Sequence, residues 1–340
     1  MGRTTLRDSL VGVRAPGFVG DSDDWINTEP LTMEELRGRL VLVDFWDYTC
    51  INCIRTLPYL KEWHARYKDK GLVIVGIHTP EFGFAKERES VEQAIARFGI
   101  EYPVLLDSNY ENWNAYGNRY WPHKYLVGPD GRIIYDHVGE GAYGETEAVV
   151  QKELREINPG ASLPNIMAPL RGMDKPGAVC YPMTPELYLG YRRGVLGNPE
   201  GYRPDHVVDF VDPKTHRDGQ VYAQGHFYNG DEFLRHARET PEPEDYILVP
   251  YHALEVNAVI RPASGPFEVV VTQDGKPLDM ADAGTDVHEA DGRTLVLVDG
   301  PRMYRIVANR EFGSHELKLS STSSSFAIYA FTFGSCEEPD

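Results

Sequence analysis

Cysteine is scarce in this sequence. Four cysteines in 340 residues are too few for a scaffold held together by dense disulfide bridges. Cys50 and Cys53 stand three positions apart, whereas Cys180 and Cys336 are far from each other in the chain. The close pair and the distant pair therefore need separate explanations.

The sequence also lacks long apolar runs. Its longest ones, LVLVDFW and LVIVGI, have the length of a strand and fall far short of the ~20 residues that a membrane-spanning helix needs. The first residues contain no continuous apolar segment followed by a small-residue cleavage site, which is a poor match to a secretory signal. We expect no transmembrane segment and a cytoplasmic location, or an extracytoplasmic one if the sequence is a mature or trimmed fragment.

A basic cluster is missing as well. The formal net charge is −18, and lysine and arginine are scattered among acidic residues. Such a surface repels the phosphates of nucleic acids and anionic lipid head groups. We therefore expect no nucleic-acid partner. The hydrophobic content of 41% is ordinary for a chain that folds into globular domains.

The order of sequence patterns predicts two domains. Apolar strand-like segments alternate with amphipathic helices from about residue 40 to 156, which favours an α/β domain with a central mixed sheet flanked by helices. A stretch rich in proline and glycine follows, and then short alternating strands that are typical of an all-β antiparallel sandwich. We place the α/β domain at 1–160 with an N-terminal extension over 1–38, the linker at 161–184 and the sandwich at 185–340.

The most informative segment is VLVDFWDYTCINCIRTLPYL, in which an apolar strand leads through Cys-x-x-Cys into an amphipathic helix. The unpaired N–H groups and partial positive charge of a helix start stabilise a thiolate, so we expect a lowered pKa for Cys50 and assign it as the nucleophile. Cys53, one turn later, is placed to resolve a mixed disulfide. Asp44 lies among apolar neighbours, where an ionised carboxylate is costly unless it accepts a proton, so we assign it as the base for Cys53.

These residues resemble the thioredoxin superfamily. The strand VLVDFW before the cysteines is similar to the core strand of that family, and Pro122 stands where the family has its cis-proline. The resemblance implies that Pro122 lies against Cys50 and that its neighbours offer backbone groups to a substrate strand. A loop in GIHTPEF follows a core strand at the same end. Candidates for the substrate groove or for tuning the thiols are Trp46, Thr49, Trp121, His123 and Glu81.

The segments WDYTCINCIRTLPYL, GIHTPEFGF and NRYWPHKYLVGPDGRI are similar to the soluble C-terminal portion of DipZ-type thiol-disulfide oxidoreductases. That resemblance spans nearly the whole chain and implies a thioredoxin-like domain followed by a β-sandwich similar to carbohydrate-binding modules. We expect thiol-disulfide exchange on a protein or small-molecule disulfide, with no metal and no cofactor beyond a redox-active Cys50–Cys53 disulfide. The electron donor is unidentified, because the membrane-embedded domain that supplies electrons in DipZ proteins has no counterpart in these residues.

Two other function classes stay open. One is a peroxiredoxin-like thiol peroxidase or antioxidant, although Asp47 replaces the threonine that usually stands three residues before a peroxidatic cysteine. The other is a binding protein whose sandwich captures a glycan or a protein. All five tryptophans lie at or before Trp121, so the aromatic platform of a sugar site would depend on tyrosines such as Tyr222, Tyr228 and Tyr251.

Several further motifs have ordinary interpretations. Cys180 and Cys336 either form a structural disulfide or stay as two unrelated thiols, and the second is favoured in a cytoplasmic protein. They do not supply the second pair that a four-ligand zinc site with Cys50 and Cys53 would need. The G-x-G-x-x-G pattern at 139–144 follows a hairpin, which favours a turn over a dinucleotide site. Four histidines lack the close spacing of metal ligands: His206, His216, His226 and His236.

Overall fold

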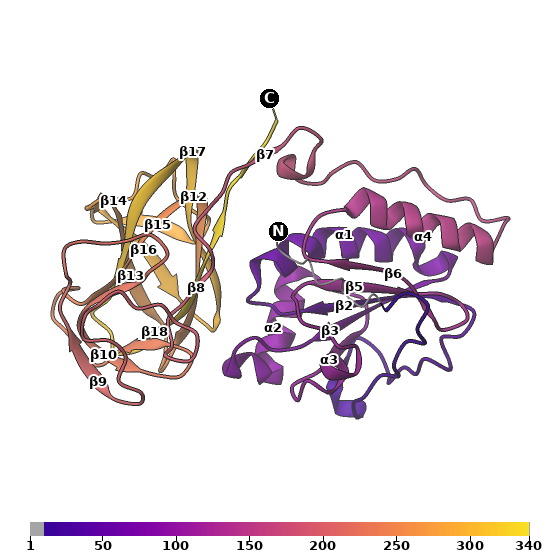
Figure 1. Cartoon of the computed structure of the whole chain (residues 1–340), viewed down its shortest axis with the longest axis horizontal. Helices are drawn as coiled ribbons and strands as arrows, with labels where there is room; N and C mark the ends of the chain where they lie inside the picture. Colours follow the sequence, from indigo (N-terminus) through magenta and orange to yellow (C-terminus); the bar gives the residue numbers. More distant parts are fainter. Residues whose placement is uncertain (1–9, 340) are drawn as a thin grey trace, which may run out of the picture. The chain divides into compact units, whose positions relative to one another are not determined.

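The computed structural model describes residues 10–339 and divides into two compact units, one that ends at Asp174 and one that begins at Lys175 (Figure 1). The first unit combines helices with a mixed sheet, and the second is built from antiparallel strands. The predicted fold class is confirmed. In the part of the chain that the structure describes, every helix is too short or too polar to cross a membrane.

The first unit is built on a six-stranded sheet, counted over residues 10–339, with the order β1-β4-β3-β2-β5-β6. The pairs β2–β3 and β3–β4 are parallel, whereas β5 and β6 form the antiparallel hairpin that the Gly-Pro-Asp-Gly turn predicts. The carboxyl ends of the parallel strands meet at one edge, which is where α/β domains place their sites. The strands are β1 (Trp25–Ile26), β2 (Leu40–Trp46), β3 (Leu72–His78), β4 (Val104–Leu106), β5 (His123–Val127) and β6 (Ile133–Val138).

The two faces of this sheet carry different layers. Alternate residues of a strand point to opposite faces, and Val41, Val43 and Phe45 of β2 belong to a core that Trp25, Leu36 and Tyr116 complete. The intervening side chains, including Asp44, point to the other face, along which α1 and α4 run (Figure 1). The helices are α1 (Ile51–Tyr67), α2 (Arg88–Phe98), α3 (Glu111–Ala115) and α4 (Tyr143–Ile157), with short 3-10 turns η1 (Ser22–Asp24), η2 (Lys68–Lys70), η3 (Gly83–Lys86) and η4 (Gly172–Asp174).

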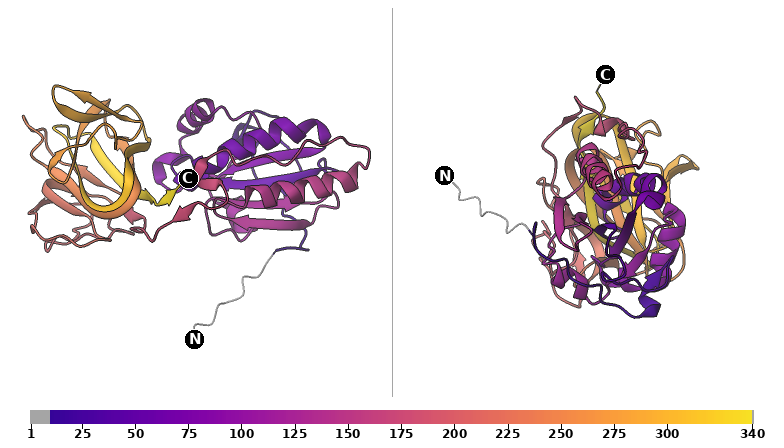
Figure 2. Two further views of the ribbon diagram at one scale, coloured as in Figure 1. Left: turned by 90° about the horizontal axis from the view of Figure 1, so that it is seen from above. Right: turned by 90° about the vertical axis from the view of Figure 1, so that its right-hand side faces the viewer.

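Two segments that the sequence assigns to an N-terminal extension and to a linker pack against the core of the first unit. Trp25–Ile26, inside the expected extension, adds edge strand β1 next to β4. The proline-rich stretch after α4 runs back along the helices (Figure 2). Its backbone is held by buried side chains, since Glu147 accepts from the N–H of Met167 (2.8 Å) and Tyr59 Oη accepts from the N–H of Leu170 (2.8 Å). Much of the expected linker is therefore part of the first unit, because it satisfies polar groups on α1 and α4.

The second unit, over its described residues, is one hydrogen-bonded sheet of eleven strands that folds back on itself. Strand β12 pairs with β17 along almost its whole length, with β10 near its start and with β18 near its end, and a bulge interrupts its register with β17 between Ala253 and Glu255. A bulge bends a strand, so one long strand serves both faces of the core. The strands are β8 (Leu187–Tyr188), β9 (Val207–Phe210), β10 (Tyr222–Asn229), β11 (Leu234–His236), β12 (Tyr246–Pro262), β13 (Phe267–Gln273), β14 (Lys276–Pro277), β15 (Val287–Ala290), β16 (Arg293–Val298), β17 (Arg302–Ser320) and β18 (Phe326–Gly334).

The long strands depart from the sequence-based expectation. DYILVPYHA and EVNAVIRP suggest two strands, as do MYRIVAN and HELKLSS, but each pair forms one continuous strand, β12 and β17. The tyrosines proposed for a sugar platform also differ from expectation. Tyr222 and Tyr251 are buried, with exposed fractions of 2% each, and only Tyr228 is partly exposed. The first two rings therefore belong to the interior of the unit and offer no flat face to a ligand.

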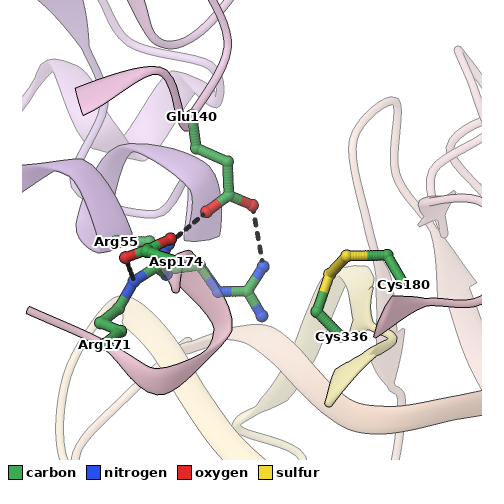
Figure 3. Close-up of a disulfide and its surroundings, with 6 residues drawn as sticks. All are labelled: Arg55, Glu140, Arg171, Asp174, Cys180 and Cys336. Atoms are coloured by element: carbon green, nitrogen blue, oxygen red, sulfur yellow. Dashed lines mark hydrogen bonds and ion pairs between the residues drawn. A yellow bond between two sulfur atoms is a disulfide. The ribbon is translucent and has the colours of Figure 1, made fainter. Parts of the chain in front are cut away.

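Cys180 and Cys336 form a disulfide, which corrects the favoured expectation of two unrelated thiols (Figure 3). They are direct partners in a two-stranded ladder between β7 (Val179–Cys180) and β19 (Cys336–Glu337). The sequence separation of 156 hid this pairing, because only the fold of the second unit brings its first and last strands together. The bridge thus closes a loop around almost the entire unit.

Candidate active site

The two remaining cysteines mark the amino end of α1. Cys50 is the N-cap, and its sulfur accepts a hydrogen bond from the backbone N–H of Cys53 (3.3 Å), while its carbonyl accepts from Ile54 (3.0 Å). Both side chains are thiols; Cys50 is partly exposed and Cys53 is buried with 1% of its surface exposed. A substrate therefore reaches the first sulfur, and the second lies one turn behind it.

The thiols are less acidic than the helix start alone suggests. Burial raises the pKa of the Cys50 thiol, and hydrogen bonds from Cys53 only partly oppose this. The expectation of a lowered pKa for Cys50 is wrong for this conformation, because desolvation of the thiolate outweighs the favourable contact with the helix end. The pKa of Cys53 is raised further, mainly by burial and then by its interaction with Cys50. Cys50 is thus the more acidic and the more accessible of the pair.

Asp44 lies on β2, on the face that α1 covers, with 1% of its surface exposed. Burial raises the pKa of its carboxyl group from 3.8 to about 7, and the positive charge of Lys124 opposes the rise. Its Oδ1 accepts no hydrogen bond from the described residues. The carboxylate also raises the pKa of Cys53, which places the two groups within electrostatic reach. A carboxyl group that titrates near neutral pH is suited to accept a proton from a thiol.

A second buried carboxylate holds the loop before the cysteines. Asp47 is fully buried and accepts hydrogen bonds from the backbone N–H (2.6 Å) and hydroxyl of Thr49 and from the N–H of Glu81 (2.8 Å). His78 Nε2 lies 3.8 Å from Asp47 Oδ2, and burial lowers the pKa of His78 to about 3, so its ring is neutral. Thr49 and Glu81 therefore fix the backbone around Cys50 through one shared partner, Asp47.

The segment before β5 lies at the same end of the sheet. The Trp121–Pro122 peptide bond is cis, and His123 pairs with Phe45 near the carboxyl end of β2. The indole N–H of Trp121 donates to the carbonyl of Thr79 (2.9 Å), which ties this segment to the loop after β3. Trp121 is partly exposed, so it can contact a substrate next to the thiols.

Two residues predicted for the substrate groove, His123 and Trp46, lie where a substrate at the thiols does not contact them. His123 points to the opposite face from Asp44, where its ring contacts Asn118 (2.7 Å) and Asp136 (3.2 Å). The structure does not bring it together with the cysteines, because alternation along β5 turns it away. Trp46 is fully buried and packs edge-on against His78, with 5.1 Å between ring centroids. Its buried ring packs beside the site and cannot contact a substrate.

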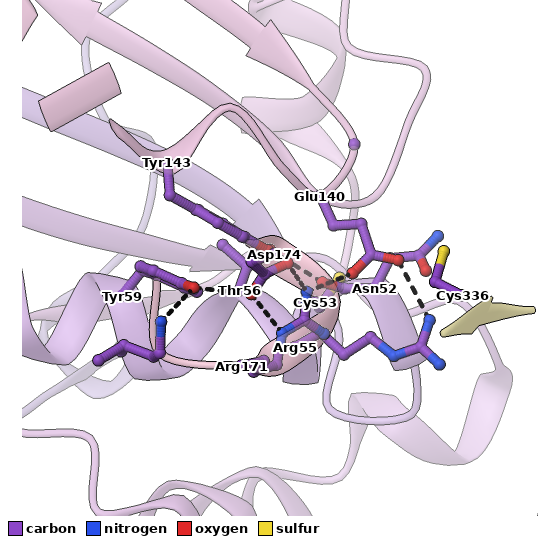
Figure 4. Close-up of polar contacts among 12 residues, drawn as sticks. Asn52, Cys53, Arg55, Thr56, Tyr59, Glu140, Tyr143, Arg171, Asp174 and Cys336 are labelled. Carbon is purple, nitrogen blue, oxygen red and sulfur yellow. Dashed lines mark hydrogen bonds and ion pairs between the residues drawn. The ribbon is translucent and has the colours of Figure 1, made fainter. Parts of the chain in front are cut away.

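Ion pairs brace the first turns of α1 (Figure 4). Glu140, in the loop between β6 and α4, contacts both Arg55 (3.1 Å) and Arg171 (3.1 Å). Arg171 also pairs with Asp174 (2.5 Å), which accepts a hydrogen bond from Tyr59 Oη (2.7 Å). The pattern at 139–144 is thus the turn into α4 and a bracing point for the helix that carries the cysteines.

Residues that could hold a metal do not gather in the described part of the chain. No group of three or more His, Cys, Asp or Glu side chains there has the arrangement of a metal site. Three of the four regularly spaced histidines have separate carboxylate partners, namely His216 with Asp212 (2.8 Å), His226 with Asp209 (3.4 Å) and His236 with Asp245 (3.0 Å), whereas the ring of His206 contacts the carbonyl of Pro204 (2.8 Å).

Two buried residues at the site were missed by the sequence argument. Lys124 is fully buried on β5, and its only signal was a lysine directly before the apolar residues of that strand. Asp47 entered that argument only as evidence against a peroxidase. The structure shows it holding the loop that carries Cys50. Neither role follows from sequence spacing, because each depends on which segments pair.

Comparison with known proteins gives a family match to each unit. Residues 11–136 match the AhpC/TSA family, and residues 184–334 match the thioredoxin like C-terminal domain. The chain is 33% identical over 314 residues to protein DipZ of Mycobacterium bovis, which covers 91% of this chain and 41% of that protein. It is 26% identical over 149 residues to the thiol-disulfide oxidoreductase ResA of Bacillus thuringiensis, covering 44% of this chain and 79% of the relative.

Among solved structures, a thiol-disulfide isomerase from Corynebacterium glutamicum aligns with a TM-score of 0.38 and 25% identity, over 41% of this chain and 96% of that one. The chain spans about two fifths, 41%, of the length of the DipZ proteins that it matches.

Proposed function

Because this chain belongs to the thioredoxin-like proteins, as the matches of its two units indicate, we propose that it catalyses thiol-disulfide exchange through Cys50 and Cys53. The observation that carries the proposal is the pair of thiols at the start of α1, one accessible and one buried, above a carboxyl group with a pKa of about 7. The proposed substrates are disulfides of proteins or small molecules.

In the proposed cycle the Cys50 thiolate attacks a substrate disulfide. A bond forms between Cys50 and one substrate sulfur, and the other substrate sulfur leaves as a thiolate. Cys53 then gives its proton to Asp44 and attacks the sulfur of Cys50. The mixed disulfide breaks and the second substrate thiolate leaves. Cys50 and Cys53 are thereby oxidised to a disulfide. A dithiol donor, which we leave unnamed, returns two electrons and restores the thiols.

The test is the reduction of insulin disulfides by the full chain with dithiothreitol as donor. Wild-type protein should accelerate the reaction, and Cys50→Ser should abolish the acceleration because it removes the attacking sulfur. A Cys180→Ala/Cys336→Ala variant is the control, since it removes two sulfurs that lie outside the proposed site. Equal activity of Cys50→Ser and wild type would exclude the assignment.

Assays on the full-length protein also test the two competing functions, peroxide reduction and glycan binding. A peroxidase would consume hydrogen peroxide rapidly through Cys50, whereas we expect slow consumption because burial, and to a smaller extent the charges of Glu81 and Asp47, raise the pKa of the Cys50 thiol. Binding of a glycan by the second unit stays a prediction. A glycan array probed with the full chain tests it, and Tyr228 is the one tyrosine of the three proposed that is partly exposed.

The Cys180–Cys336 disulfide bears on where the protein works. Disulfides persist in oxidising compartments and are rare in the cytosol. We therefore propose an extracytoplasmic location, in place of the cytoplasmic one that the first residues suggested. Alkylation of thiols in intact cells, followed by a count of the cysteines that resist alkylation until reduction, tests this. Reduced Cys180 and Cys336 in the cell would refute it.

A further inference from the structure

A buried lysine faces the proposed proton acceptor. Lys124 on β5 is the direct cross-strand partner of Asp44 on β2, and both residues are buried, with exposed fractions of 0% and 1%. Opposed residues of an antiparallel pair direct their side chains to the same face of the sheet. That face is the one that α1 covers, so the ammonium group of Lys124 and the carboxyl group of Asp44 share the space beneath Cys53.

The ammonium group has a fixed position there. Lys124 Nζ donates a hydrogen bond to the carbonyl oxygen of Gly139 (3.0 Å) and lies 5.9 Å from the ring centroid of Tyr143. The N–H of Gly139 donates in turn to the carbonyl of Pro122 (2.8 Å). A lysine that only snorkelled to the surface would expose its amine, but this one is held inside by the loop after β6.

Charged and titratable groups surround Lys124 from every neighbouring element. Burial lowers the pKa of Lys124, while Asp44 from β2, Cys53 from α1 and Glu140 from the loop after β6 raise it. His137 on β6 is kept neutral, since burial and then the charge of Lys124 lower its pKa. The other groups near the pair are the phenols of Tyr143 and Tyr102. Burial raises the pKa of both, and the charge of Asp44 raises that of Tyr102 further.

The proton transfer in the proposed cycle moves one negative charge within this space. The S–H bond of Cys53 breaks and an O–H bond forms on Asp44, so the charge passes from the carboxylate to the sulfur. An unpaired charge in a buried site is costly, whichever atom carries it. A cation within reach of both atoms offsets that cost before and after the transfer.

We propose that Lys124 is a positioning residue for the resolving step, whose ammonium group keeps Asp44 ionised to take the proton of Cys53 and then faces the Cys53 thiolate. The proposal rests on the thiol-disulfide exchange proposed above and adds a residue to it. The reaction needs no further reactant, because Lys124 gains and loses no proton.

The test separates the two chemical steps in one experiment. Reduced full-length protein is mixed in a stopped-flow instrument with dithiobis(nitrobenzoic acid), a small aromatic disulfide that releases a coloured thiolate. The first phase of colour reports attack by Cys50, and the second reports displacement of the bound aromatic thiolate by Cys53. The signal of a Cys50→Ser/Cys53→Ser variant, treated identically, is subtracted to remove any contribution from Cys180 and Cys336.

In wild-type protein the second phase should accelerate with rising pH around a midpoint near the Asp44 pKa of about 7. Lys124→Met should move that midpoint up by about one pH unit or more, because a buried carboxyl group loses its opposite charge. At neutral pH the ionised fraction of Asp44 then falls from about one half to about one tenth, which slows the second phase about five-fold. The first phase should keep its rate.

Three comparisons distinguish this role from a structural one. Lys124→Arg should retain the wild-type midpoint because it retains the charge. Tyr143→Phe, which alters the wall of the same space without changing its charge, should also leave the midpoint in place. In an Asp44→Asn background the transition near neutral pH should be absent both with and without Lys124→Met, because the carboxyl group that produces it is gone.

A readout that needs no turnover completes the test. In a Cys50→Ser background, the ultraviolet absorbance of the Cys53 thiolate should titrate at higher pH after Lys124→Met. An unchanged midpoint of the second phase, or an equal slowing of both phases at every pH, would overturn the inference. Those results would leave the exchange function standing, whereas failure of the wild type to release the aromatic thiolate would refute the exchange function itself.

Discussion

Replacing Asp44 by Asn should stabilise the first unit at neutral and alkaline pH. The carboxyl pKa is about 7 in the folded protein against 3.8 for the ordinary value. Between these two values the folded chain holds a proton that the unfolded chain has lost, so folding stability falls as the pH rises through this window. Below about pH 4 both states are protonated and the group contributes nothing.

The size of the effect follows from that difference in pKa. A gap between 3.8 and about 7 corresponds to about 4 kcal/mol once the pH exceeds the upper value. Solvent screening is small because Asp44 is only 1% exposed. The Asn variant leaves Lys124 without its opposite charge, which offsets part of the gain. We therefore expect a net stabilisation of about 2–4 kcal/mol at about pH 8 that shrinks towards zero near about pH 4.

Tryptophan fluorescence makes the measurement specific. All five tryptophans lie in the first unit, the last being Trp121, so urea unfolding followed by their emission reports on that unit within the full chain. The protein is kept reduced so that Cys50 and Cys53 stay as thiols. Glu145→Gln is the matched control, since it removes one exposed carboxylate near the start of α4 and should leave stability almost unchanged.

One result would refute the reasoning. If Asp44→Asn is no more stable than wild type at alkaline pH, or if the difference between them does not change with pH, then the carboxyl group is not held in the desolvated state that the structure shows. Other groups would then stabilise the ionised carboxylate of Asp44 in the folded protein.

Further expectations concern the thiols, the disulfide and the segment after α4. Cys53→Ala should accumulate a mixed disulfide between Cys50 and its substrate, visible as a mass increase that dithiothreitol removes; a chain that stays unmodified would contradict the resolving role. Cys180→Ala/Cys336→Ala should destabilise the second unit by about 3–5 kcal/mol, because the bridge closes a long loop, with a sequence separation of 156. Loss of circular dichroism on heating checks this, and an unchanged unfolding temperature would contradict it. Glu147→Gln should weaken the contacts that Glu147 makes with Arg66 and with the backbone of Met167 by about 1–3 kcal/mol, so that a protease cuts residues 158–170 faster; cleavage at the wild-type rate would contradict this.

Much of the first unit could be predicted because its signals are local. The strand before Cys50 and the helix after it, β2 and α1, follow from the periods of their apolar residues. The two cysteines, Asp44 and the chain around them lie within a single stretch of sequence. Periodicity fails for the long strands β12 and β17, since a bulge or a polar interruption looks like a turn until the partner strand is known.

The sequence by itself determined that the chain has an α/β unit with a dithiol at the start of a helix and an antiparallel β unit after it, because alternation and helical spacing are written in neighbouring residues. Only the tertiary structure decided which distant groups meet. Lys124 faces Asp44 because β5 pairs with β2 in one register, and Cys180 bonds to Cys336 because the second unit brings its ends together. The acidity of Cys50 was decided there too, since burial depends on everything packed around the sulfur.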